Sequence, residues 1–221
     1  MGSSIIIDES GSRREVLKRR VIARVDELMP TGITIKEPVE YLGNELDESA
    51  IDVLRKARTD YLVEAVKKTA DIDVTPDRKG AYLKLPSDFL RFVRLTSKEW
   101  QRDIELLTPR ESSLFANAFK KHMAPNAHRP MAVITPWESS SAALFVMPCE
   151  EHQEVSLFYI PKLKAQDMPT ILDDAVIWLA ASRVLAIIRR GDLASNAERN
   201  GYAAMAGINI GIAGENQEAP E

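Results

Sequence analysis

The sequence predicts an α+β protein in which long N- and C-terminal helices form a helical bundle with an inserted small antiparallel β-rich domain. Two observations lead to this class. Apolar residues recur at helical spacing near both ends of the chain, and the middle consists of short apolar runs separated by turn-forming residues, which is typical of strands. The predicted boundaries are 1–74 for the N-terminal arm and helices, 75–168 for the β-rich insertion, 169–206 for a C-terminal helical hairpin and 207–221 for a C-terminal tail.

Two helices are predicted before the insertion. The first covers about 12–28, because Leu17, Val21 and Val25 recur at helical spacing. The second covers about 47–69, after a connection that Pro30 and Pro38 interrupt. One-sided helices of this length do not stand alone, so each must place its apolar stripe against another helix.

Six short strands are predicted in the middle of the chain, at about 82–85, 92–95, 104–107, 131–135, 143–147 and 155–160. Between two of them, Thr108 as N-cap and Pro109 at the first helical position predict a short helix over about 109–121. The following segment, 122–130, has two prolines and no apolar period. We expect it to be an exposed connection of the kind that often contacts partners.

The C-terminal part begins with a predicted buried helix from about Thr170 to Ile188, rich in apolar residues on most of its faces. Gly191 is expected to end this helix, and a second helix is expected to continue through Met205. The final residues, 207–221, combine glycines with acidic residues and are expected to form a flexible or partner-ordered tail.

Composition and charge exclude several classes of protein. Acidic residues outnumber basic ones by 33 to 29, giving a net charge of -4, which argues against a protein that mainly grips phosphate backbone through bulk charge. The 45% hydrophobic content is that of ordinary globular proteins, and no membrane partner is expected. No secretory signal is predicted, because acidic residues directly follow Ile5–Ile7.

No catalytic, cofactor-binding or metal-binding residues are predicted. The chain contains neither the phosphate-binding G-x-x-x-x-G-K-[ST] pattern nor the G-x-G-x-x-G and G-x-S-x-G patterns of dinucleotide-binding proteins and hydrolases. The single cysteine, Cys149, cannot form an internal disulfide. Cys149 and His152 could supply two metal ligands, but no second pair follows them.

A cluster of basic residues on the first helix includes Arg13, Arg14 and Lys18. Such a cluster could bind nucleic acid phosphates or an acidic protein groove, and the alternative is an ordinary solvated helix face. One possible function is therefore a small nucleic-acid or regulatory binding module that uses this basic N-terminal helix.

A second possible function comes from the stretch Tyr82–Leu95, which is followed by Trp100. It resembles a pattern of the head-to-tail adaptor, or connector ring, proteins of tailed bacteriophages, including the tail tubular protein A type. In that family an apolar strand leads into Leu-Pro-x-Asp-Phe-Leu-Arg, here Leu85–Arg91. A second strand and a hairpin with a tryptophan follow.

The order of parts extends this resemblance over about residues 47–206. N-terminal helices come first, the β-rich middle ends in a Tyr-Ile-Pro segment at 159–161, and an alanine-rich buried helix follows at 171–190. Relative to the short-tailed phage pattern, this chain has a longer N-terminal extension and an abbreviated β region. That departure leaves open whether the chain belongs to the ring next to the portal or to a later one.

The resemblance implies a non-enzymatic structural virion protein of the viral tail region. It implies a homo-oligomeric ring of twelve copies that docks below the portal protein, contacts further tail or ring proteins and lets double-stranded DNA pass through its channel during ejection. The implied location is the head–tail junction of the virion, after assembly in the host cytoplasm. On this interpretation we expect the isoleucines of both tails to become ordered only against neighbouring subunits, as added strands: Ile5, Ile6, Ile7, Ile208, Ile210 and Ile212.

Overall fold

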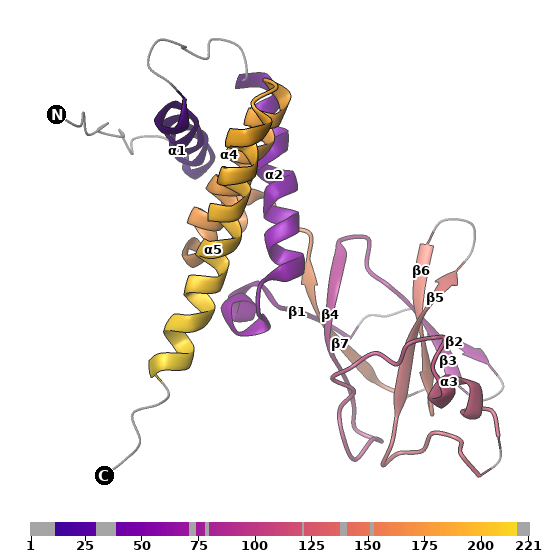
Figure 1. Ribbon diagram of the computed structural model, residues 1–221. Helices are drawn as coiled ribbons and strands as arrows, with labels where there is room; N and C mark the ends of the chain where they lie inside the picture. Colours follow the sequence, from indigo (N-terminus) through magenta and orange to yellow (C-terminus); the bar gives the residue numbers. More distant parts are fainter. Residues whose placement is uncertain are drawn as a thin grey trace, which may run out of the picture. The chain divides into compact units, whose positions relative to one another are not determined.

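The computed structural model describes residues 12–29, 39–70, 74–77, 80–120, 122–137, 141–150 and 153–215. The chain forms two compact units, one from Met1–Glu64 with Lys162–Glu221 and one from Ala65–Pro161. The first, the helical unit, contains helices from both ends of the chain, and the second, the β-rich unit, contains the strands (Figure 1). The mixed α+β class with small antiparallel sheets is therefore confirmed.

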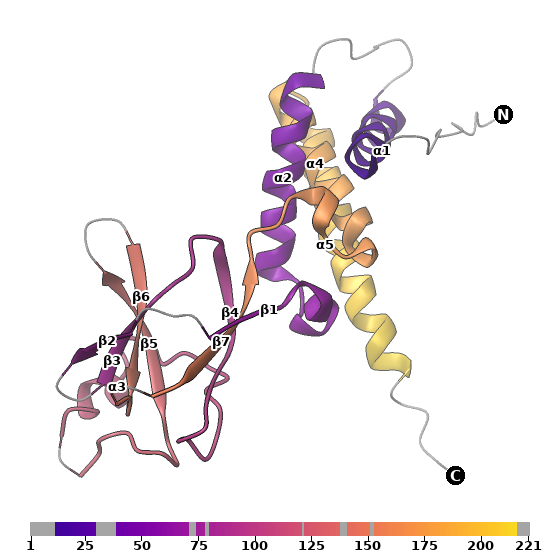
Figure 2. The same ribbon diagram turned by 180° about the vertical axis from the view of Figure 1, so that it is seen from behind.

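The helical unit is organised around α4, which contacts α1, α2 and α5 (Figure 2). α1 buries Leu17, Val21 and Val25, the residues whose spacing predicted it, and α4 is buried on most of its faces. The bounds are α1 Arg13–Leu28, α2 Val39–Lys56, η1 Thr59–Ala65, η2 Ala165–Asp167, η3 Thr170–Leu172, α4 Asp173–Ile187 and α5 Gly191–Glu215.

The turn between α4 and α5 is closed by backbone hydrogen bonds. Arg189 has a positive φ of 60°, and its N–H donates to the carbonyl oxygen of Ala186, while the N–H of Arg190 donates to that of Leu185. These two bonds form a Schellman motif, in which the left-handed position is usually a glycine. The predicted terminator Gly191 is instead the first residue of α5.

The β-rich unit contains two antiparallel sheets, with strand orders β1-β7-β4 and β2-β3-β6-β5. In the first sheet Leu95 of β4 faces Leu157 of β7, and in the second Leu83 of β3 faces Leu144 of β6. All four of these leucines are fully buried in one core. The bounds are β1 Lys67–Thr69, β2 Val74–Asp77, β3 Gly80–Lys84, β4 Phe89–Ser97, α3 Ser113–Asn117, β5 Met131–Trp137, β6 Ser141–Met147 and β7 Val155–Pro161.

The predicted helix over 47–69 is wrong at both ends. α2 covers Val39–Lys56, η1 covers Thr59–Ala65, and Lys67–Thr69 is strand β1. β1 pairs with β7, with Lys67 opposite Tyr159, so the chain must leave the helix to reach its strand partner. Because β1 belongs to the sheet, the β-rich unit begins at Ala65, earlier than the predicted start at residue 75.

Two predicted elements between β4 and β5 are also wrong. The run 104–107 makes only an isolated bridge, between Ile104 and Leu95. The helix predicted over 109–121 shortens to α3, because the N–H of Thr108 donates to the carbonyl of Ala132 on β5 and ties this residue to the sheet. Ser112 is the N-cap instead, and its hydroxyl accepts a hydrogen bond from the N–H of Phe115 at 3.2 Å.

At the C-terminal end, α5 continues to Glu215. The backbone of 207–215 is therefore helical where a tail was expected from residue 207. Glycine lowers helix propensity but does not forbid a helix, so the glycines of this segment were a weak stop signal.

Candidate functional site

The motif that resembles the connector family forms the connection between β3 and β4. β3 ends at Lys84 and β4 begins at Phe89. The N–H of Phe89 donates to the carbonyl of Pro86 at 3.0 Å and closes a turn. Phe89 then stacks on Tyr159 of β7, with ring centroids 5.8 Å apart. The turn thus brings the start of β4 against the end of the neighbouring strand.

Asp88 in this turn joins three strands of one sheet. Its carboxylate accepts a hydrogen bond from the Tyr159 hydroxyl at 2.9 Å and forms an ion pair with Lys67 of β1 at 2.7 Å. Burial opposes ionisation of Asp88, but these two hydrogen bonds outweigh it, so its pKa lies below the usual value. Burial and the bond to this carboxylate together raise the pKa of Tyr159 to about 12.

The hydrogen bonds of Asp88 have a structural role. The Asp88 carboxylate accepts hydrogen bonds from Lys67 on β1 and Tyr159 on β7. Both partners satisfy the carboxylate, and Tyr159 is only 5% exposed. The polar groups of this motif therefore hold the β3–β4 turn against β1 and β7.

The basic cluster on α1 is largely neutralised within the helical unit. Arg13 pairs with Asp173 at the start of α4 at 2.7 Å, and Arg14 pairs with Asp47 of α2 at 2.9 Å. Lys18 pairs with Glu15 one turn earlier, at 2.8 Å.

These ion pairs connect the helices. Asp173 and Asp174 lie in the first turn of α4, where carboxylates are favoured by the helix dipole, and Arg20 reaches Asp174 at 2.6 Å. The cations of α1 are thus placed to orient this helix on α2 and α4. Their availability for nucleic acid phosphates is correspondingly reduced.

The isoleucines of the two tails are only partly placed. Ile5, Ile6 and Ile7 lie outside the described residues. Residues 208, 210 and 212 belong to the helical backbone of α5, but their side chains lie outside the described part. Contacts of either tail with neighbouring subunits stay a prediction, and the helical backbone of 208–212 differs from the added strand expected there.

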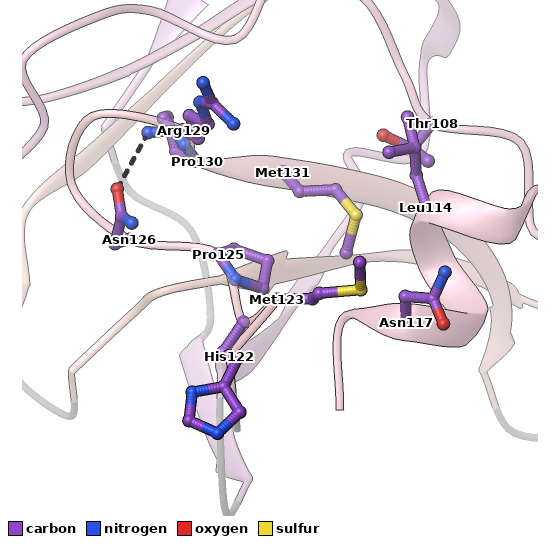
Figure 3. A pocket seen from close by; sticks show the side chains of 11 residues that line it. Thr108, Leu114, Asn117, His122, Met123, Pro125, Asn126, Arg129, Pro130 and Met131 are labelled. Carbon is purple, nitrogen blue, oxygen red and sulfur yellow. Dashed lines mark hydrogen bonds between the residues drawn. The ribbon is translucent and has the colours of Figure 1, made fainter. Parts of the chain in front are cut away.

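A pocket of about 520 Å³ opens on the β-rich unit, between α3 and the loop that precedes β5. Its apolar lining comes from α3, from this loop and from the start of β5. Figure 3 shows the Met123 and Met131 side chains extending toward Leu114 and Asn117 on the opposite side. Leu114 is 70% exposed and Met123 is 61% exposed, whereas Met131 is buried. The predicted partner-contacting segment 122–130 therefore forms one wall of this pocket.

Polar groups lie around the apolar centre of the pocket. Asn126 shapes the loop, because its side-chain oxygen accepts hydrogen bonds from the N–H groups of His128 at 3.0 Å and Arg129 at 3.2 Å. The side chains of His122 and Arg129 point away from the two methionines in Figure 3 and are exposed. The pocket thus combines an apolar centre with polar side chains at its rim, among them the cation of Arg129. The composition of the loop predicted that it is exposed. Nothing in the local sequence predicted that α3 lies beside this loop.

Metal-ligating side chains do not cluster in the described part of the chain. No three His, Cys, Asp or Glu side chains there are grouped so as to hold a metal ion. Cys149 is buried, and burial together with the nearby carboxylates of Glu99 and Glu150 raises its pKa to about 11. At neutral pH this thiol is protonated and a poor nucleophile.

Among the described helices, none has both the length and the apolar character that crossing a bilayer requires.

No protein-family model matches this chain, and no curated protein matches it either. The connector resemblance therefore rests on the Leu85–Phe89 pattern and on the order of parts.

Proposed function

We propose that this protein is a structural virion protein, the subunit of a head-to-tail connector ring that docks below the portal and lines a channel for DNA. In this proposal the helices of both chain ends form the bundle of the ring, and the β-rich unit is an insertion in it. Its partners are further copies of the chain, the portal protein and other tail or ring proteins. A copy number of twelve follows from the family resemblance.

The observation that carries the proposal is the position of the Leu-Pro-x-Asp-Phe motif within the order of parts. The motif closes the connection between β3 and β4, and Asp88 joins it to Tyr159 at the end of the β-rich segment. Helices from 1–64 and 162–221 belong to one unit, with the strands of 65–161 between them in sequence. This is the arrangement that the resemblance implies.

Electrostatics support a passage for DNA over a tight grip on it. The chain carries a net charge of -4, and the cations Arg13, Arg14 and Lys18 are paired with carboxylates of the same chain. Nonspecific affinity for DNA comes mainly from cations that neutralise phosphates and release counterions. A channel with few free cations would let DNA slide. The same pairs weigh against the alternative of a binding module built on α1.

The test is sedimentation of the purified full chain alone and with the portal protein encoded beside it, followed by negative-stain imaging of any heavy fraction. We expect co-sedimentation and images of stacked rings. A chain that never co-sediments with portal and never forms rings at any concentration would overturn the proposal.

A DNA-binding experiment distinguishes the two candidate functions. The binding-module alternative predicts retention of duplex DNA that falls steeply with salt and is lost when Arg13, Arg14 and Lys18 are replaced by alanine. The connector proposal predicts weak retention that these replacements leave nearly unchanged. Retardation in gels at two salt concentrations measures both.

A further inference from the structure

The pocket between α3 and the loop before β5 exposes apolar surface that the described part of the chain does not cover. Leu114 and Met123 are 70% and 61% exposed, and Met131 forms a buried floor. Its volume of about 520 Å³ lies within the range of about 300–1,000 Å³ that ligand pockets occupy. The lining combines exposed apolar side chains with polar ones, which suits an occupant that carries both kinds of group.

The rim of the pocket carries a cation without a partner among the described residues. The backbone N–H of Arg129 is bonded to Asn126, but no hydrogen bond or ion pair joins its guanidinium to another described residue. The pocket therefore suits an occupant in which a short apolar run is followed at once by carboxylates.

The N-terminal segment of the chain has this pattern. Residues 1–11 precede α1 and lie outside the described part. Within them, the three consecutive isoleucines Ile5–Ile7 are directly followed by Asp8 and Glu9. The other isoleucine-rich segment, 208–212, belongs to the backbone of helix α5, and no acidic residue directly follows its isoleucines.

We propose that this pocket binds the N-terminal segment Ile5–Glu9 of a second copy of the chain, with the isoleucines against Leu114 and Met123 and the carboxylates toward Arg129. The inference rests on the proposed function in one respect, that copies associate. A segment of one copy bound in a pocket of the next makes a heterologous contact, and repeated contacts of this kind form a ring where the rotation between copies closes. The proposal thus assigns a contact that would build the ring.

The first experiment measures binding of a labelled synthetic peptide of residues 1–11 to the full chain carrying Ile6→Asp, which disables its own segment. We expect saturable binding. Adding Leu114→Asp or Met123→Asp should weaken it at least about tenfold, because each places a charge in the apolar centre. Both side chains are exposed, so neither change disturbs the core.

The matched control is Ile187→Asp, which changes an apolar side chain of 52% exposure on α4 and should leave peptide binding unchanged. Absence of peptide binding would overturn the proposal. Equal loss in the control and in both pocket variants would also overturn it, as would stronger binding of a peptide of residues 206–217 than of the N-terminal one.

The charge pairing is tested separately. Arg129→Glu should weaken peptide binding about threefold to tenfold, as expected for an exposed ion pair with repulsion added. A peptide with Asp8→Lys and Glu9→Lys should recover binding to this variant. Arg102→Glu is the control, since Arg102 is an exposed arginine of the same unit that does not line the pocket. Equal effects of the two reversals would remove Arg129 from the proposal.

A mixing experiment decides whether the segment comes from another copy. The full chain with Ile6→Asp retains an intact pocket, and the full chain with Leu114→Asp retains an intact segment. Each should sediment as a monomer alone, and an equimolar mixture should form a one-to-one complex. If wild type stays monomeric at all concentrations while the peptide binds, the segment occupies its own pocket and the proposal is overturned.

These outcomes are distinguishable from failure of the connector function. Wild type that stacks on portal while the peptide fails to bind the pocket would overturn only the inference about the segment. Wild type that self-associates through the pocket but ignores portal would overturn only the connector function.

Discussion

The helical unit and the β-rich unit differ at the two places where the sequence suggested a contact with a partner, the basic cluster of α1 and the segment 122–130. In the helical unit, cations of α1 and α4 are paired with carboxylates of other helices, including Arg14 with Asp47 and Arg183 with Asp52. In the β-rich unit, large apolar side chains beside α3 stay exposed, with Leu114 at 70% and Met123 at 61%. The more conspicuous cluster in the sequence is thus the one already satisfied by its own chain.

This difference teaches that residue type alone does not identify an interaction surface. A basic run becomes available to a partner only when its own fold leaves it without carboxylates. Apolar side chains in a loop become informative once the structure shows that they line one pocket. The predictions below test which contacts stabilise each unit.

The largest effect is expected from a cavity in the β-rich unit. Leu157 of β7 pairs with Leu95 of β4 and is fully buried in the core of the β-rich unit. Leu157→Ala should therefore lower the free energy of unfolding by about 2–5 kcal/mol. The measurement is hydrogen exchange resolved by peptide. Protection should fall mainly in 65–161, and equal loss in the helical unit would show that the two units unfold together. Leu106→Ala, at an 84% exposed position, should change stability by less than about 0.5 kcal/mol.

A second prediction compares one glycine from each unit. A Cβ at Gly80 of β3 would lie 2.1 Å from the carbonyl oxygen of Val146, whereas one at Gly201 of α5 would lie 2.9 Å from Leu179 side-chain atoms. Backbone cannot move aside as a side chain can, so Gly80→Ala should cost about 1–3 kcal/mol. Gly201→Ala should cost less, because alanine also gains about 1 kcal/mol of helix propensity. Urea unfolding of both variants gives the order, and the reverse order would contradict it.

A third prediction concerns the hydroxyl of Tyr159, whose pKa is raised from 10.0 to about 12 by burial and by the Asp88 carboxylate. Because the folded pKa exceeds the unfolded one, the stabilisation is fully present below pH 10 and is lost as the pH rises toward 12. Tyr159→Phe should cost about 1–2 kcal/mol at neutral pH and should remove part of the fall in the urea midpoint between pH about 10 and 12. Tyr41→Phe, at a 60% exposed position, is the control and should retain the full fall.

The Asp88 network also predicts how stability changes at acid pH. The pKa of Asp88 is lowered from 3.8, because hydrogen bonds from Lys67 and Tyr159 outweigh burial. Its stabilising contribution is present above this unfolded value and is lost as the pH falls through the folded one. Asp88→Asn should therefore flatten the acid dependence of the urea midpoint below pH about 4. An unchanged acid limb in this variant would show that Asp88 does not hold the sheet in this way.

The smallest effect is expected for the ion pairs of α1. Arg14 is partly exposed and pairs with Asp47, so Arg14→Ala should cost no more than about 1 kcal/mol, and less at high salt. Arg58→Ala, which loses only an exposed pair with the nearby Asp60, should cost about 0–0.5 kcal/mol. Thermal unfolding at low and high salt measures both. A loss for Arg14→Ala well above 1 kcal/mol would mean that charge, and not apolar burial, holds α1 in place.

Much of the fold could be predicted from the local pattern of apolar residues in the sequence. The spacing of Leu17, Val21 and Val25 predicted α1, and apolar runs predicted β3, β5, β6 and β7 near their observed bounds. Prediction failed where a tertiary partner overrides the local pattern. Lys67–Thr69 reads as the end of a helix but pairs with β7, and Thr108 reads as a helix cap but bonds to β5.

The candidate site was predictable only in part. The segment 122–130 was expected to be exposed and to contact partners, and it forms one wall of the pocket. The opposite wall comes from α3, and the floor is Met131 at the start of β5. Nothing in the spacing of residues relates these three elements, because the pocket is formed by the way the sheet brings them together.

The sequence by itself determined the class of the protein, the helices near its two ends and the strands between them, because periodicity and turn chemistry act over a few residues. The tertiary structure alone decided the partners. Asp88 accepts a hydrogen bond from Tyr159, which lies 71 positions further along the chain. Arg13 donates one to Asp173, at a separation of 160 positions. Which charges are satisfied and which apolar side chains stay exposed depends on these distant meetings, and they decide which surface is left for a partner.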